Sequence, residues 1–307
     1  MVPGSEGRVI SSDPQIGSAS PSRDPRAGGL SLLFVPGQRP DAVQIAALAA
    51  KAIHPAQGQG PLSGSTSSSP VPRAQQFFVS HQPDNGENWL ELLGGGMTFE
   101  LTGLAPGPAS VPPPNAHYLG LDPAIGAAPL DAVALHPGPH LAGGEGLLPV
   151  VRMTAAIGAA LAALPGVQAV CWHAARSWVG APYFVHAIEE WLGGGAFPAL
   201  GLTSLVRGDD GSFTSEGLAL LIGQEVRVEP GTARKSARRQ GDGGGNAGAG
   251  GSAGGEAASA RLALRAIHSL VLSGAIHIPT RLTGPEGEQL AAEPSADLRL
   301  VRVRREE

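Results

Sequence analysis

The chain has 307 residues, of which 42% are hydrophobic and 4% aromatic, and a formal net charge of −5 at pH 7. This length suits one large domain or two small ones, with a core built mainly from aliphatic side chains. The negative charge argues against a general nucleic-acid-binding protein, because phosphate contacts require a positive surface.

Signals for compartment and membrane insertion predict a cytoplasmic protein. Cys171 is the only cysteine, so no internal disulfide can form and a reducing compartment is expected. The N-terminal segment lacks the apolar stretch of a secretory signal peptide. No run of about 18 apolar residues occurs, so no membrane span is predicted. The heavy use of Ala, Gly, Pro and Arg is typical of a bacterium with a GC-rich genome.

Three segments rich in Ser, Pro and Gly are predicted to be disordered: residues 1–28, 56–71 and 231–258. They hold too few large apolar side chains to offset the entropy that a chain loses on ordering. The rest of the chain, residues 29–304, is predicted to form a single domain that the last two segments interrupt.

In the first half, apolar residues at helical spacing predict one helix, Asp41–Ile53, with Asp41 at its N-terminus after Pro40. Short apolar or alternating runs predict strands. These strands are Leu30–Val35, Gln75–Ser80, Met97–Leu104 and Asp131–His136.

The second half has clearer helix signals. A proline at the start and a glycine at the end predict the helices Pro149–Gly166 and Pro182–Gly195, and an amphipathic pattern predicts a third at Ala258–Gly274. The predicted strands are Val167–His173, Pro198–Gly208, Glu225–Glu229, 275–282 and 297–304.

The order of these elements predicts the fold class. Successive strands without a helix between them form antiparallel pairs. Mixed connections of this kind indicate an α+β fold, with a mixed, mainly antiparallel sheet and helices packed on it. Two ferredoxin-like halves, residues 29–148 and 149–304, are one architecture that fits this order.

Five blocks, in order, resemble a bacterial family catalogued as domain of unknown function 4261. The first three are SLLFVPGQRPDAVQIAALAAKAI, FELTGLAPGPASVPPP and DAVALHPGPHLA. The last two, which are the more specific, are LPGVQAVCWHAARSWVGAPYFVHAIEEW and PALGLTSLVRGDDGSFTSEGLALLIGQEVRVEP. Together they cover about residues 30–304 without the predicted disordered inserts.

The last block carries the family's most specific positions, a Thr-x-Gly-Leu, a second Gly and a Glu that opens a strand. The corresponding residues here are Ser215, Gly217, Leu218, Gly223 and Glu225. Ser215 stands where the family usually has Thr, and the Gly-rich stretch after Glu229 resembles an insertion. The resemblance implies a fold but no mechanism.

Cys171 and His173 lie two residues apart on a predicted strand, so their side chains share one face. A thiolate–imidazole pair suits nucleophilic catalysis if the histidine lowers the pKa of the thiol. The favoured alternative is that Cys171 is a small buried hydrophobic residue and that His173 ends the strand, because no second catalytic signature accompanies them.

His136 and His140 are the candidate metal ligands. Two histidines four residues apart can bind zinc when they lie on a helix. The intervening Pro-Gly-Pro prevents a helix here, and a third ligand, such as His117 or His173, would have to come from elsewhere. Solvated side chains on a turn are the favoured interpretation, so no metal is expected.

The stretch TSEGLALLIGQEVRVEP, residues 214–230, holds two carboxylates, Glu216 and Glu225. Paired carboxylates act as acid and base when their environments separate their pKa values. The favoured alternative is a turn that leads into a strand, with Gly217 and Gly223 supplying backbone freedom. Trp172, Ser215 and Glu216 are the candidate binding residues.

Two further features of the sequence bear on ligand binding. The basic cluster Arg234–Arg239 suits nucleic acid or an acidic partner, but it lacks interleaved aromatic residues for base stacking. A solvated insertion is therefore favoured. The glycine triplets Gly94–Gly96, Gly193–Gly195 and Gly243–Gly245 lack the residues of a phosphate-binding loop, so no cofactor is expected.

The sequence as a whole favours a non-catalytic domain that binds another protein or a small molecule. The alternative is a hydrolase in which Cys171, His173 and Glu225 converge in one pocket. The identity of the partner is left open, and neither a membrane nor nucleic acid is expected to be that partner.

Overall fold

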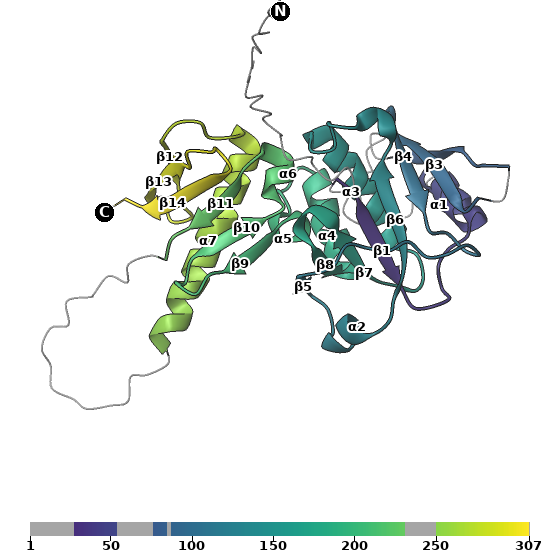
Figure 1. Ribbon diagram of the computed structural model, residues 1–307, viewed down its shortest axis with the longest axis horizontal. Coiled ribbons are helices and arrows are strands. Elements are labelled where there is room, and N and C mark those ends of the chain that lie inside the picture. Colours follow the sequence, from purple (N-terminus) through teal and green to yellow (C-terminus); the bar gives the residue numbers. More distant parts are fainter. Residues whose placement is uncertain (1–27, 54–75, 85–86, 231–249, 307) are drawn as a thin grey trace, which may run out of the picture.

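The computed structural model describes residues 28–53, 76–84, 87–230 and 250–306. Figure 1 shows two β-sheets side by side, with the short helices α5 (Ala199–Leu202) and α6 (Leu218–Ile222) close to their junction. The predicted α+β fold is confirmed. Residues 1–27 and the predicted disordered segment 56–71 lie outside the described residues.

The first sheet has eight strands in the order β2-β3-β4-β6-β1-β7-β8-β5. Strands β5 and β8 run parallel, and every other neighbouring pair is antiparallel. The strands are β1 (Leu30–Phe34), β2 (Phe77–His81), β3 (Trp89–Gly94), β4 (Met97–Thr102), β5 (His117–Leu119), β6 (Asp131–Pro137), β7 (Val167–Trp172) and β8 (Ser177–Gly180).

Helices cover one face of this sheet. Helix α3 contacts β1, β6 and β7, α4 contacts α3, β7 and β8, and α1 contacts β2. The elements are α1 (Ala42–Ile53), α2 (Pro123–Ala127), α3 (Leu148–Ala162), α4 (Ala181–Leu192) and the 3-10 turns η2 (Pro139–Leu141) and η3 (His173–Ala175).

Strand β1 is buried on both faces. Because side chains alternate along a strand, Leu30, Leu32 and Phe34 point into the main core beneath the helices. Leu33 points to the opposite face, where it packs with Cys171 in a small second cluster. The run of apolar residues in β1 therefore reflects burial on both sides of a central strand.

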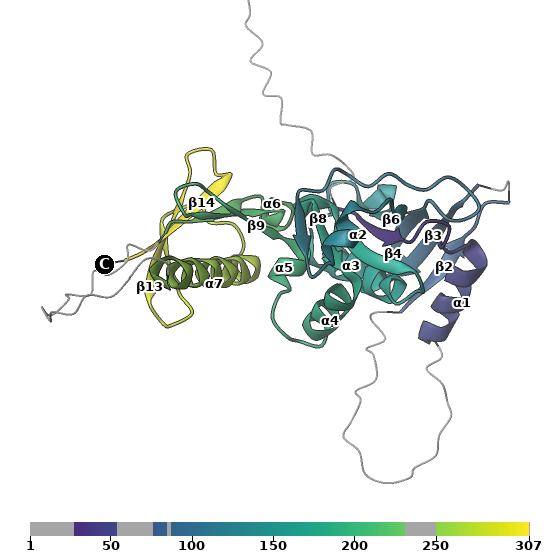
Figure 2. The same ribbon diagram turned by 90° about the horizontal axis from the view of Figure 1, so that it is seen from below.

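The second sheet has six strands in the order β12-β13-β14-β11-β10-β9. Strands β11 and β14 run parallel, and the other neighbouring pairs are antiparallel. The strands are β9 (Ser204–Arg207), β10 (Phe213–Glu216), β11 (Glu225–Val228), β12 (Thr280–Thr283), β13 (Gln289–Pro294) and β14 (Leu300–Arg305). Helix α7 (Gly250–Ser273) crosses one face, as Figure 2 shows from below.

The two sheets share one hydrophobic core. A single continuous cluster of buried side chains includes Leu32 and Val170 from the first sheet and Val226, Leu290 and Val301 from the second. Helix α5 contacts both α4 and α7, and α6 contacts η3. Burial therefore continues across the junction of the two sheets.

The structure differs from the predicted organisation in three details. The chain leaves the first sheet after β8, at Gly180, and enters the second at Ser204, so the two sheets do not divide at residue 148. Their eight and six strands also differ from a pair of four-stranded ferredoxin-like halves. The predicted strand Pro198–Gly208 is in fact α5 followed by β9, because a short apolar run does not distinguish a helix from a strand.

The prediction of disorder in segment 231–258 is wrong at the C-terminal end of that segment. Helix α7 already begins at Gly250, eight residues before the predicted start at Ala258. Its first six residues, GGSAGG, include four glycines, which are poor helix formers and make the composition resemble a disordered segment. The helix extends into them from the alanine-rich residues 257–260, because a helix extends readily from a turn that is already formed. Among the described residues, no helix is long and apolar enough to cross a membrane.

Candidate functional site

The turn that joins β10, α6 and β11 is built around the carboxylate of Glu225. This carboxylate accepts hydrogen bonds from the backbone N–H groups of Gly217 (2.9 Å) and Ala219 (3.0 Å) and from the Ser215 hydroxyl. The Ser215 hydroxyl in turn accepts a hydrogen bond of 2.8 Å from the N–H of Val226. Burial raises the pKa of Glu225 above its ordinary value, although these hydrogen bonds oppose the shift. Glu225 and Ser215 therefore hold the turn together.

Glu216, at the end of β10, connects the second sheet to the first. Its carboxylate lies 2.8 Å from Nε2 of His117 on β5 and accepts a hydrogen bond from the Arg176 guanidinium. Burial raises the pKa of Glu216, but Arg176 and His117 outweigh that effect, so the pKa lies below its ordinary value. The carboxylate is thus held ionised at the junction of the sheets.

The backbone beside Glu216 also lies in close contact with the residues that follow β7 in the first sheet. Gly217 has a φ of 96°, and a Cβ atom placed there would lie 3.0 Å from Ala175 in η3. Arg176, which follows, itself has a φ of 47°. A glycine is needed at position 217 because the left-handed backbone and the close approach both disfavour a side chain.

Cys171 is fully buried on the face of the first sheet opposite α3. It packs with Leu33, Ala132 and Ala169, and burial raises the pKa of its thiol to about 12. The thiol is therefore neutral near pH 7, whereas nucleophilic catalysis requires the thiolate. Its neighbour Trp172 lies in the main core, so its side chain is not exposed to a partner.

His173 has a different partner from the one the hydrolase hypothesis requires. Its Nε2 atom lies 2.8 Å from the hydroxyl of Ser31, a fully buried residue of β1. The His173 ring also contacts the ring of His136, with centroids 5.2 Å apart. Glu225 lies in the other sheet and contacts Ser215 and backbone groups. These contacts lend no support to one hydrolase site made from Cys171, His173 and Glu225.

The candidate metal ligands His136 and His140 lie at the end of β6 and in η2. His140 Nδ1 is 3.2 Å from the Thr98 hydroxyl. His117, the possible third ligand, bonds to Glu216. Within the described part of the chain, no group of three or more His, Cys, Asp or Glu side chains is arranged to hold a metal ion.

A concave surface lies on the second sheet, where sequence analysis placed no site. It is a groove of about 1320 Å³ bordered by the ends of β11 and β14 and by the β12–β13 hairpin. We call it the charged groove. Its lining residues are Glu229, Pro230, Pro279, Thr280, Arg281, Glu286, Glu288, Ala291, Ala292, Glu293, Arg304, Arg305 and Glu306.

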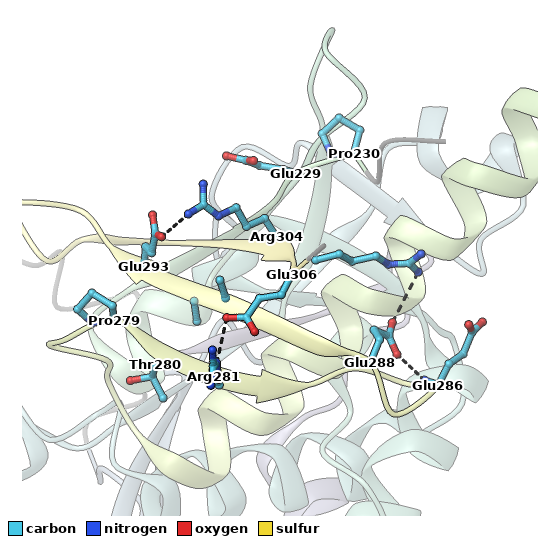
Figure 3. Close-up of a pocket in the computed structure, with 13 residues that line it drawn as sticks. Glu229, Pro230, Pro279, Thr280, Arg281, Glu286, Glu288, Glu293, Arg304 and Glu306 are labelled. Carbon is cyan, nitrogen blue, oxygen red and sulfur yellow. Dashed lines mark hydrogen bonds and ion pairs between the residues drawn. The ribbon is translucent and has the colours of Figure 1, made fainter. Parts of the chain in front are cut away.

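Ion pairs join side chains that line the charged groove, as Figure 3 shows. Arg281 pairs with Glu306 at 3.0 Å, Arg304 with Glu293 at 2.6 Å, and Arg305 with Glu288 at 3.6 Å. Exposed pairs of this kind contribute little to stability. Their main effect is to neutralise the three arginines of the groove.

Two lining carboxylates remain without an ion pair among the described residues, Glu229 and Glu286. Both side chains are exposed. The groove is lined by five glutamates and three arginines, and the difference is a net charge of two negative units. It therefore favours a ligand or partner with positive charge.

Sequence analysis missed Arg176 and the whole charged groove. One signal was present, because valine alternates with arginine in residues 301–304 and places the charges on one face of a strand. Strand surfaces are commonly charged, however, and the ion pairs depend on β13 and β14 lying side by side.

The chain matches no known protein family, no curated protein and no solved structure. The resemblance to domain of unknown function family 4261 therefore stays a prediction. The Ser215, Gly217 and Glu225 positions that carry it are the ones that build the β10–α6–β11 turn.

Proposed function

We propose that this protein is a non-catalytic interaction protein that binds another protein through the charged groove on its second sheet. The observation that carries the proposal is the groove itself, at about 1320 Å³ and lined by exposed charged side chains. Small-molecule sites are typically about 300–1,000 Å³ and mainly apolar. A larger, charged and open groove fits the polar surface of a protein partner better.

The positions of the candidate catalytic residues agree with this proposal. The Cys171 thiol is buried and neutral, and Glu225 accepts hydrogen bonds from its own turn. We keep the bacterial cytoplasm as the proposed location, since the only cysteine of the chain is free.

Affinity capture with two charge-reversal variants tests the proposal. The groove variant is Glu229→Lys/Glu286→Lys, and the matched control is Glu189→Lys/Glu190→Lys on the exposed side of α4, which makes the same change in net charge. Wild type and control should recover the same partner in near-equal amounts. The groove variant should recover at least ~10-fold less, because like charges placed across an interface repel.

The proposal is wrong if the groove variant captures the partner as well as the control does. It is also wrong if no protein is recovered in constant proportion with the wild-type chain. Circular dichroism of each variant establishes that a loss of binding does not come from a loss of folding.

A further inference from the structure

The edge of the second sheet beside the charged groove carries backbone groups that are free to bind. Strand β12 is the last in the strand order and pairs only with β13. In the adjoining turn, the Gly284 N–H donates to the Glu288 carbonyl at 2.8 Å. Hydrogen-bonded and non-bonded pairs alternate along an antiparallel ladder, so Thr280 and Leu282 bond to β13. Arg281 and Thr283 therefore point their N–H and C=O groups away from the sheet.

These outward groups lie on an accessible strand. Arg281 and Thr283 are exposed, and among the described residues no backbone hydrogen bond satisfies their outward groups. Pro279 and Pro285 flank the strand. Short, proline-flanked edges resist pairing with a whole second sheet, but they leave room for a short extended peptide.

The two carboxylates that have no ion pair among the described residues lie on different sides of the groove and supply the charge preference. Glu286 lies in the turn that follows β12, and Glu229 follows β11. Figure 3 shows them on different sides of the groove. A chain that extends across the groove from the β12 edge can place a cation near each of them, whereas a single small cation cannot reach both.

Resting on the proposed function above, we propose that the partner presents a short, extended, basic segment. This segment adds as a strand to the edge of β12, where it bonds to the backbone of Arg281 and Thr283. Where the segment follows β12 it places a lysine or arginine near Glu286, and where it continues across the groove over β13 and β14 it places a second one near Glu229. The backbone pairing supplies orientation, and the charge complementarity supplies selectivity against acidic segments.

Binding of short labelled peptides to the full chain tests this inference, with fluorescence anisotropy as the readout. The basic probe is an acetylated, amidated peptide that alternates Thr with Lys, and the acidic probe has Glu in place of every Lys. A third probe carries N-methyl groups on every backbone nitrogen, so it keeps the charge but cannot donate along either edge.

The basic probe should bind, and the acidic probe should bind at least ~10-fold more weakly. Glu229→Gln/Glu286→Gln should lower the affinity for the basic probe by about 3–10-fold. The control Glu189→Gln/Glu190→Gln should leave that affinity unchanged. N-methylation should weaken binding by about 10-fold, and bound probe should slow hydrogen exchange at the amides of Arg281 and Thr283.

Equal binding of the acidic and basic probes would overturn the inference, and so would equal weakening by the groove and control variants. Unchanged binding of the N-methylated probe would exclude strand addition. If the groove variant loses its partner in affinity capture but the basic probe does not bind, the proposed function stands and only the basic, extended segment is wrong.

The cluster Arg234–Arg239, which lies outside the described residues, is a competing occupant because it follows Pro230 closely in the sequence. Replacing its four cations with Gln should change the affinity of the basic probe by less than about 2-fold. A gain of about 10-fold or more would mean that the chain's own cations compete for the groove, and it would overturn the assignment to a separate partner.

Discussion

The two sheets differ in what they present on the face opposite their long helices. On the first sheet this face holds Ser31, Leu33 and Cys171, all fully buried. On the second it presents Arg302 and Arg304, both exposed. The residue types usually associated with catalysis are thus inside the molecule, while the side chains that a partner can reach are ordinary surface charges. Residue type alone is a poor guide to a site without knowledge of exposure.

The largest expected effect tests whether the two sheets, despite this difference, unfold as one cooperative unit. Leu290→Ala removes a fully buried side chain of the second sheet and should lower the free energy of unfolding by about 2–5 kcal/mol. All four tryptophans precede residue 193, so their fluorescence reports on the part of the chain around the first sheet. Because the core is continuous, fluorescence and far-UV circular dichroism should show the same shift in the midpoint of unfolding.

Leu32→Ala in β1, a buried residue of the same cluster, is the control for Leu290→Ala. It should shift both signals to a similar extent. Two separate transitions, with tryptophan fluorescence unaffected by Leu290→Ala, would show that the sheets unfold independently.

The buried thiol of the first sheet should be almost inert in the folded protein. At pH 8 a thiol with a pKa of about 12 is neutral, and Cys171 is fully buried. Reaction with a disulfide reagent should be at least ~100-fold slower in the native state than in denaturant. Rapid stoichiometric labelling of the native protein would revive the hydrolase hypothesis.

Gly217→Ala tests the close contact between the sheets. The substitution places a Cβ atom 3.0 Å from Ala175 on a backbone with a φ of 96°, and it should cost about 1–3 kcal/mol of stability. The control Gly223→Ala has a similar φ of 78° but no atom within 4 Å of the new Cβ. Thermal denaturation should show the larger loss for Gly217→Ala, and equal losses would mean that the contact with Ala175 has no effect.

Glu216→Gln tests the ionic connection between the sheets. It should lower stability at pH 7 by about 1 kcal/mol, since a hydrogen-bonded charge is lost. The pKa of Glu216 in the folded protein lies below its ordinary value of 4.5, so its contribution is present above that value and is lost as pH falls through the folded pKa. The difference in unfolding free energy between wild type and variant should therefore shrink below pH 4.5 in denaturant titrations. A difference that stays constant with pH would contradict this assignment.

The smallest effect is expected in the charged groove. Glu229→Gln/Glu286→Gln removes two exposed carboxylates that form no ion pair with any described residue, so the free energy of unfolding should change by less than about 0.5 kcal/mol. Urea denaturation at low salt measures this. A loss comparable to that of Gly217→Ala would show that these carboxylates stabilise the fold and would weaken their assignment to binding.

The sequence was sufficient to predict most of the longer elements. Hydrophobic periodicity located β1, α1, α3 and α4, because burial on one or two faces leaves a clear pattern. It missed β3, β5, β8, β10 and β13, because short strands with mixed polarity are hard to separate from loops. It also could not give the strand order, since the pairing of β1 with β6 and β7 joins segments about 100 or more residues apart in the sequence.

The functional surface was harder to predict than the fold. The sequence pointed to Ser215, Glu216 and Glu225, which the structure places in a turn and at a junction. The charged groove combines residues from three strands, the β12–β13 turn and the segment after β11. Only their spatial arrangement shows that Glu229 and Glu286 have no ion pair among the described residues. Exposure and pairing depend on the folded chain, so periodicity cannot supply them.

Strand β14 lies between β13 and β11, although it is the last strand in chain order. While a ribosome is still synthesising the chain, the β12–β13 hairpin and the β9–β11 strands have no partner to join them. Both groups would then expose backbone and apolar edges until β14 emerges and fills the gap. The charged groove cannot exist before that moment, because Arg304 and Arg305 belong to the inserted strand, so a nascent chain would be unable to engage the proposed partner prematurely.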